Sequence, residues 1–139
     1  MANLIYDSFF NKLMDGAIDL NTDTIKCALL TSSYIPSAAH ILFSEVNSNE
    51  MEQILLPIPN GYTTGGNALS GVTITGKKFD ANNVSWANST ITARYAVIYK
   101  PANGALICLL DFGSNRVTSN QTFTVEFNTN GIITFAQSA

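Results

Sequence analysis

Charged side chains are scarce in this sequence of 139 residues. Only 12% of the residues are Asp, Glu, Lys or Arg, about half of the usual share of roughly 25%. The seven basic residues form no stripe that could neutralise nucleic-acid phosphates, and the net charge is −3. We therefore expect no direct contact with DNA or RNA. A surface poor in charge suits contact with other proteins, and an ordinary Asn- and Thr-rich β-protein explains the composition equally well.

Long apolar runs and a secretory signal are also missing from the pattern. Residues 1–6 have no basic stretch followed by an apolar stretch, and no apolar run approaches the length needed to span a bilayer. We expect a protein that is made in a cytoplasm and makes no membrane contact. Cys27 and Cys108, the two cysteines, fall in predicted strands. Two buried thiols are the better expectation in a reducing compartment, although the sequence leaves a disulfide open.

Residues that could support catalysis are few. His40 is the one histidine, and no G-x-S-x-G motif accompanies it. A catalytic zinc site would need three protein ligands, which one histidine and two strand cysteines do not provide. We interpret His40 as a surface or packing residue. The sequence predicts no catalytic residue, no cofactor and no metal.

Two groups of acidic residues have a simpler explanation than chemistry. Residues 19–23 resemble the start of a calcium loop, but the sixth position is Thr24 and the twelfth is Leu30, where Gly and Glu are required. Turn formation and capping explain these carboxylates better. Glu45, Glu50 and Glu52 lie in one irregular stretch and are interpreted as a solvated acidic loop.

The segment 79–112 organises the fold. Tyr95, Val97 and Tyr99 alternate with Arg94, Ala96, Ile98 and Lys100 along the chain. This alternation predicts a half-buried strand. Residues 105–110 are apolar on both faces, which predicts a central strand. The turn residues 101–104 between them end in Asn-Gly, so the two strands should form a hairpin at the centre of the fold.

The remaining pattern predicts one mainly β domain over residues 1–139. Apolar side chains at helical spacing within residues 4–15 predict a short N-terminal helix that ends at Gly16 and packs on its own sheet or on a neighbouring subunit. Further strands are expected at residues 24–31, 72–75, 78–79, 84–86, 122–127 and 132–135. Short antiparallel strands at this spacing favour a β-sandwich or jelly roll. Residues 32–66 form a long irregular connection with one helical turn expected near residues 40–46, and such connections are usually functional or mobile.

The order of several short sequence motifs is similar to that in a family of small virion structural proteins of tailed bacteriophages and prophages. These motifs are DTIK at 23–26, TSSY at 31–34, GYTTGG at 61–66, FDANNVSW at 79–86, residues 93–100 and LDFG at 110–113. The resemblance covers residues 3–135 and is weakest at 35–60. It implies a head decoration, or cement, protein on the capsid surface, made in the host bacterial cytoplasm, and it brings no catalytic residues.

Two apolar stretches are the candidate contact sites with the major capsid protein or a second copy. One is the helix around Phe9 and Phe10, and the other is the connection with Ile54, Leu55 and Ile58. Self-association is expected, with a trimer favoured over a dimer.

Two alternatives stay open at this point. A tail or fibre module could bind host-surface glycan through Trp86 or Tyr62, although aromatic residues on strands more often lie in the core. A small hydrolase would need a second titratable partner beside His40.

Overall fold

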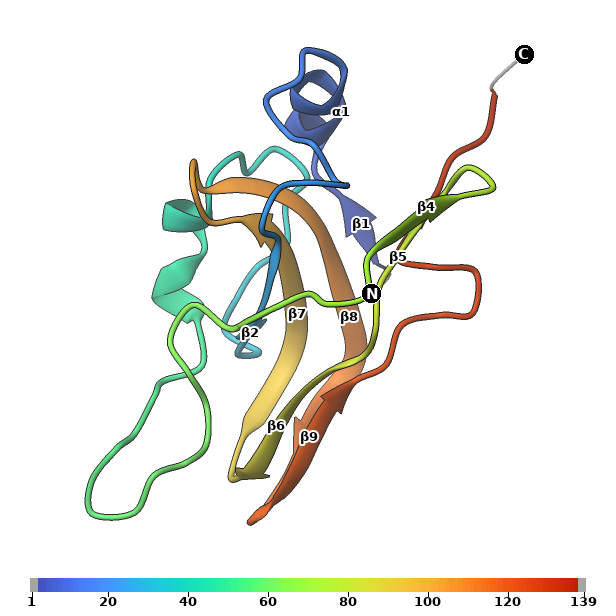
Figure 1. The fold of residues 1–139 in the computed structure, drawn as a ribbon. Helices are drawn as coiled ribbons and strands as arrows, with labels where there is room; N and C mark the ends of the chain where they lie inside the picture. Colours follow the sequence, from blue (N-terminus) through green and yellow to red (C-terminus); the bar gives the residue numbers. More distant parts are fainter. Residues whose placement is uncertain (1–2, 138–139) are drawn as a thin grey trace.

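The computed structural model describes residues 3–137, and its centre is an antiparallel sheet of five strands (Figure 1). The strand order is β1-β8-β7-β2-β3, formed by Leu4–Ile5, Ala105–Val117, Thr92–Lys100, Lys26–Leu30 and Asn67–Ala68. The predicted hairpin is confirmed, because β7 pairs with β8 from Lys100↔Ala105 to Thr92↔Val117. Strand β8 continues past Asp111 to Val117, beyond the strand predicted over residues 105–110.

Two smaller antiparallel sheets complete the β-structure. One has the order β10-β5-β4, formed by Ile133–Thr134, Lys78–Asp80 and Thr73–Thr75. The other pairs β6 (Val84–Ser89) with β9 (Gln121–Val125). The mainly β, antiparallel character of the chain is therefore confirmed. The more specific β-sandwich or jelly-roll architecture stays a prediction.

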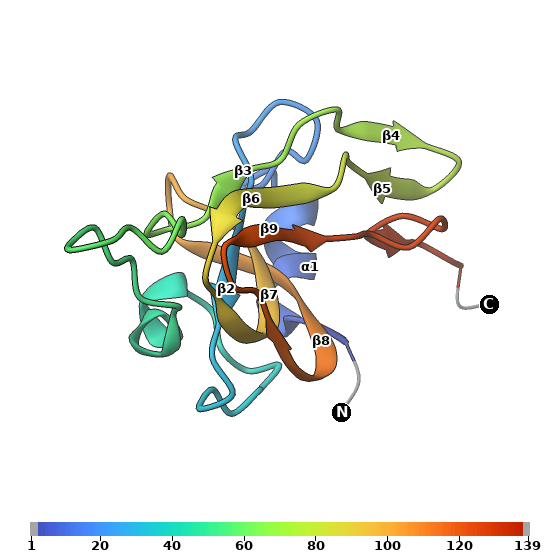
Figure 2. The ribbon, with the colours of Figure 1, turned by 90° about the horizontal axis from the view of Figure 1, so that it is seen from below.

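The main core lies between the five-stranded sheet and the smaller sheets. Figure 2 shows β6 and β9 as a layer over one face of β2, β7 and β8. Alternate residues of the large sheet point into this core, among them Leu29, Ile98 and Ile107, and they meet Trp86 and Val125 of the smaller sheet. The strand predicted at residues 122–127 corresponds to β9, which ends at Val125, and its side chains Phe123 and Val125 are buried. Apolar burial of this kind is the main favourable term in folding.

The other face of the large sheet is covered by the first half of the long connection. The short 3₁₀ helices η1 (Phe43–Glu45) and η2 (Asn47–Asn49) belong to this cover. Tyr34 and Val46 are buried against the sheet, and the Phe43 ring stacks on Tyr99 with ring centroids 4.0 Å apart. Residues 32–50 belong to the predicted connection over 32–66, and connections of that length are usually functional or mobile. Residues 32–50 instead close a second small core, which is why β7 is buried on both faces.

The N-terminal helix α1 runs over Asp7–Met14, three residues shorter at its start than the predicted helix over 4–15. Leu4 and Ile5 form β1 and pair with Leu109 and Cys108 of β8. Gly16 has φ 84°, the left-handed geometry predicted for the helix end. No helix within residues 3–137 is long and apolar enough to cross a membrane.

The two cysteines are separated by one strand of the large sheet. Cys27 of β2 is opposite Ile98 of β7, and Ile98 is opposite Cys108 of β8. Two strand spacings of about 4.8 Å place the thiols roughly 10 Å apart, beyond the reach of a disulfide. Both cysteines are free and buried, and burial raises the pKa of Cys108 to about 12. The expectation of two buried thiols is confirmed.

Candidate protein-contact loop

Residues 52–60 form a loop that projects from the body of the molecule, shown in green at the lower left of Figure 1 and at the far left of Figure 2. We call it the 52–60 loop. Its tip exposes four large apolar side chains: Ile54 at 41%, Leu55 at 61%, Leu56 at 83% and Ile58 at 78%. Scattered exposed apolar residues are ordinary on protein surfaces, but four within five positions form a patch. Such a patch on a projecting loop is suited to contact with another protein.

The side chain of Asn60 closes the base of this loop. Asn60 is 6% exposed, and its Oδ1 accepts hydrogen bonds from the backbone N–H groups of Ile54 at 3.0 Å and Tyr62 at 3.3 Å. Its Nδ2 donates to the carbonyl of Glu52 at 2.7 Å. The backbone of Asn60 accepts a further hydrogen bond from the N–H of Thr90, at the corner between β6 and β7. The loop is thereby fastened to itself and to the sheet.

A second anchor joins the two ends of the loop to β2. The hydroxyl of Tyr62 donates to Glu50 Oε2 at 2.6 Å and accepts from the N–H of Leu29 at 3.1 Å. The N–H of Gly65 also donates to Glu50 Oε2. Burial, and then the hydrogen bond to Glu50, raise the pKa of Tyr62, so its hydroxyl stays protonated and remains a donor. Glu50 therefore has a structural role, unlike the solvated carboxylate that was expected.

The loop is also stiff by composition. Pro57 and Pro59 have fixed φ angles, which reduces the number of conformations available to the tip. A segment that is already ordered loses less entropy when it binds. The 52–60 loop therefore presents its apolar side chains in one arrangement, and the exposed groups at its tip favour contact rather than chemistry.

The structure separates the predicted contact residues into two places. Ile54, Leu55 and Ile58 lie together on the loop, whereas Phe10 is 39% exposed on α1, a helix that both views show apart from the loop. Phe9 is fully buried in the main core. The prediction that Phe9 contacts a partner is wrong, because its ring is the part of α1 that docks on the domain's own sheet.

Leu56 was missed, although it is the most exposed of the four large apolar side chains of the loop. Its signal was present in the sequence, since it lies between Leu55 and Pro57 in an irregular stretch. The role of Asn60 was also missed. Asn followed by Gly reads as a simple turn, and nothing local shows that its side chain folds inward.

Trp86 and Tyr62 cannot form the glycan-stacking surface that the alternative interpretation required. Each is 2% exposed, and their rings pack together with centroids 5.7 Å apart inside the core. Sugar-binding aromatic side chains need an open ring face. That part of the alternative interpretation is wrong.

His40 is held by a chain of hydrogen bonds that leads into the second core. Its Nδ1 lies 2.8 Å from the hydroxyl of Tyr34, which lies 3.0 Å from the hydroxyl of Tyr6. Tyr34 and Tyr6 are buried, and burial raises the pKa of both hydroxyls. These contacts fix the cover formed by residues 32–50 to the sheet, so His40 has a packing role.

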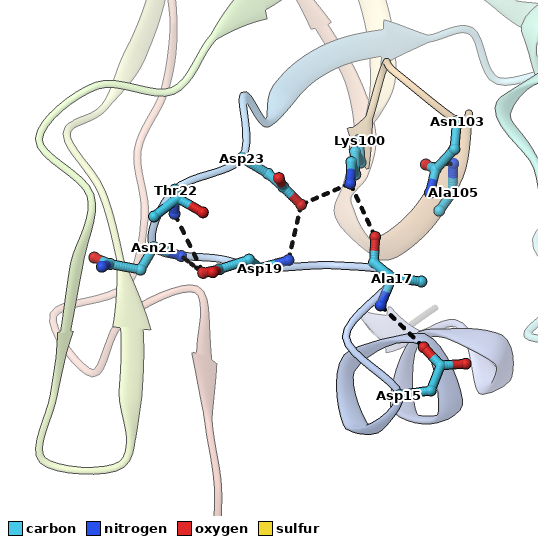
Figure 3. Close-up of polar contacts among 9 residues, drawn as sticks. All are labelled: Asp15, Ala17, Asp19, Asn21, Thr22, Asp23, Lys100, Asn103 and Ala105. Carbon is cyan, nitrogen blue, oxygen red and sulfur yellow. Dashed lines mark hydrogen bonds and ion pairs between the residues drawn. The ribbon is translucent and has the colours of Figure 1, made fainter.

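The segment 19–23 forms the turn predicted from its sequence (Figure 3). Asp19 Oδ1 accepts hydrogen bonds from the N–H groups of Asn21 and Thr22, and the Thr22 side chain followed by these N–H groups lowers the pKa of Asp19. Asp23 Oδ2 accepts from the N–H of Asp19 and lies 2.8 Å from Lys100 Nζ, and these contacts lower the pKa of Asp23. Both carboxylates serve the turn. Across the described residues, no three His, Cys, Asp or Glu side chains gather as they would around a metal ion.

Comparison with known proteins assigns no family. No family model matches the chain, no curated protein matches its sequence, and no solved structure matches its fold.

Proposed function

We propose that this chain is a non-enzymatic structural protein of a tailed-bacteriophage or prophage virion, and that it acts as a head decoration, or cement, protein. In this role it is made in the bacterial cytoplasm and binds the major capsid protein on the outer surface of the head. The observation that carries the proposal is the rigid loop with four exposed apolar side chains. The placement on a phage head comes from the order of motifs in the sequence.

The size of the apolar patch indicates what kind of binding it supports. Full burial of one Leu or Ile side chain contributes about 1.5–3 kcal/mol. Scaled by the exposed fractions of the four side chains, the tip contributes about 4–8 kcal/mol. Association itself costs on the order of 4–15 kcal/mol. One loop alone therefore binds weakly, and stable attachment needs further contact area or several copies acting together.

A cement protein meets that requirement by its arrangement. Copies that sit at symmetric positions on a shell, as a trimer in preference to a dimer, engage it several times at once, and linked contacts raise the overall affinity without new interactions. Each bound copy then stabilises the shell by mass action. The low charge of the chain favours such contacts, because charged groups are depleted at the centre of protein interfaces.

The proposal is tested on particles of the phage or prophage that encodes the chain. Heads are prepared without this protein, the purified chain is added, and binding is measured by co-sedimentation and located by electron microscopy. Wild-type chain should decorate the heads, and Leu55→Asp should reduce decoration at least tenfold. Ile35→Asp is the matched control, because Ile35 is 81% exposed outside the loop and its substitution should leave decoration unchanged.

Two results would overturn this proposal. One is density for the chain on the tail or fibres with none on the head. The other is equal decoration by wild type and by a folded Leu55→Asp variant. The N-terminal segment is unsuited to such a test, since deleting residues 1–15 removes β1 and the buried Phe9 and so compromises folding.

A further inference from the structure

A groove lies between the connection that follows α1 and the hairpin of β4 and β5. Its volume is about 450 Å³, within the range of roughly 300–1,000 Å³ that is common for binding pockets. Its lining is largely apolar and includes Leu13, Ile18, Leu20, Ile74, Phe79 and Phe135. Ile74 is 47% exposed on β4, the free edge strand of its sheet. The groove therefore offers apolar surface that a projecting side chain could fill.

Both walls of the groove are fixed by contacts already present in the chain. Lys100 Nζ donates to the carbonyl of Ala17 at 2.9 Å and pairs with Asp23, which holds the connection after α1 in place (Figure 3). The opposite wall is a hairpin whose two turn residues, Gly76 and Lys77, have φ angles of 60° and 63°. Positive φ at both positions is typical of a tight type I′ turn. A groove with fixed walls binds without a large ordering cost.

The groove and the 52–60 loop lie at opposite ends of the molecule. Figure 1 places the loop at the lower left and the β4–β5 hairpin at the upper right, and Figure 2 separates them in the same way. The loop of one chain therefore cannot enter its own groove. A contact between the two features has to join two copies.

We propose that the 52–60 loop of one copy inserts Leu55 and Leu56 into this groove of a second copy. The proposal rests on the proposed function, because that function needs several copies acting together, and it assigns the loop to the contact between those copies. The two surfaces match in character, since an exposed apolar tip meets a groove lined by apolar side chains. Burial of both removes apolar area from water on each side of the contact.

Charge supports the same pairing. Glu52 is exposed at the base of the loop, while Lys77 and Lys78 belong to the groove and Lys77 is exposed. The one carboxylate of the groove, Asp19, is already bonded to the N–H groups of its own turn. A loop that carries Glu52 therefore meets the basic side of the groove. Opposite charges around an apolar contact favour the correct orientation and suppress others.

The decisive experiment uses two variants that each keep one half of the contact. Leu55→Asp damages the loop and leaves the groove intact, and Ile74→Asp damages the groove and leaves the loop intact. Sedimentation velocity of the full chain over a concentration series should show wild type associating and each variant remaining monomeric. An equimolar mixture of the two should form a 1:1 complex, because the intact loop of one variant fits the intact groove of the other.

Controls keep this result specific. Ile35→Asp should associate like wild type, and circular dichroism should show that every variant is folded. If Ile74→Asp fails to fold, the charge pair replaces it: Glu52→Lys and Lys77→Glu should each weaken association at least fivefold, and a mixture of the two should restore it. A wild-type chain that stays monomeric at the highest concentration overturns the proposal. So does a mixture of folded variants that remains monomeric.

The same measurements separate this proposal from the proposed function. Self-association is measured without any phage particle. A monomeric wild type whose Leu55→Asp variant no longer decorates heads would assign the loop to the capsid, which overturns the loop–groove contact and supports the cement role. Association in solution together with no decoration of heads would overturn the cement role alone.

Discussion

The side chain of Asn60 accepts a hydrogen bond from the backbone N–H of Ile54 at 3.0 Å, and this contact helps to close the base of the projecting loop. The loop contributes no side chain of its tip to either core, so its order comes from its base. A polar group that is buried and fully bonded stabilises one conformation, since every alternative leaves partners unpaired. This relationship makes the loop a defined surface.

Replacing Asn60 by Ala should loosen the loop while the sheets stay intact. The N–H groups of Ile54 and Tyr62 and the carbonyl of Glu52 lose their partner, which costs about 1–3 kcal/mol in unfolding free energy. Hydrogen exchange should show faster exchange at Ile54 and Tyr62. Asn115→Ala is the control, because Asn115 is exposed on β8, and it should exchange like wild type. Unchanged protection at Ile54 in the Asn60 variant would contradict this account.

Two adjacent rings of α1 should differ sharply in their contribution to stability. Phe9 is fully buried and Phe10 is 39% exposed. Phe9→Ala should lower the unfolding free energy by about 3–5 kcal/mol, because it leaves a cavity in the main core. Phe10→Ala should lower it by about 1 kcal/mol or less. Urea denaturation measures both, with Phe9→Leu as a milder substitute if the Ala variant is unfolded.

If Phe9→Ala and Phe10→Ala lowered the unfolding free energy equally, α1 would have to pack on the sheet through a different side than the one that carries Phe9. The sequence pattern predicted an apolar side of the helix that includes both Phe9 and Phe10, and it did not show which of the two rings points into the core. In the structure, Tyr6 and Phe9 are both fully buried. The side of α1 that carries Phe9 therefore packs on the sheet.

Acid should weaken the turn shown in Figure 3. The N–H of Asp19 and then Lys100 lower the pKa of Asp23 in the folded chain. Its contribution to stability is therefore complete above the unfolded-state value of about 3.9 and is lost as the pH falls through that value toward the folded-state pKa. Between pH 5 and pH 3, the unfolding free energy of Asp23→Asn should fall less steeply than that of wild type.

Urea titrations at several pH values would measure this difference. Asp19 has a lowered pKa of its own, so the Asp23 variant should keep part of the decline. Lys100→Met should also flatten the curve, because it removes one of the two partners of Asp23. Parallel curves for wild type and Asp23→Asn would contradict the prediction.

The parts of the fold that sequence predicted well are those set by local alternation. Strands β7 and β8 were recognised because their own side chains repeat every second residue and a turn joins them. Strand β1 was missed for the opposite reason. Leu4 and Ile5 fit the helical repeat that follows them, and only their pairing with Cys108 and Leu109, more than a hundred residues away, makes them a strand.

The same contrast between local sequence and distant contacts applies to the residues of the candidate site. Ile54, Leu55 and Ile58 could be predicted, because apolar residues among prolines in an irregular stretch have no place in a regular element. The groove around Ile74 could not be predicted, since its walls come from segments that are distant in sequence. Residues 32–50 also looked like a free loop, and their packing through Tyr34 and Val46 depends on the shape of the sheet beneath them.

Gly66 and Gly16 provide a matched test of how closely the chain approaches β2 after the loop. Both have left-handed φ angles, 81° at Gly66 and 84° at Gly16. A Cβ added at Gly16 meets nothing within 4 Å, whereas one at Gly66 would overlap the carbonyl of Cys27 and lie 2.7 Å from the Cα of Ala28. Gly16→Ala should therefore cost only the backbone strain, about 1–2 kcal/mol.

Gly66→Ala carries the same strain and adds a clash with backbone that cannot rotate away. Its loss in unfolding free energy should exceed that of Gly16→Ala by about 1–3 kcal/mol, the usual cost of overpacking. Hydrogen exchange should also rise at Leu69, whose N–H donates to the carbonyl of Ile25 beside β3. If the two variants are equally stable by urea denaturation, the backbone after the loop does not lie against β2, and the anchor that orients the 52–60 loop is absent.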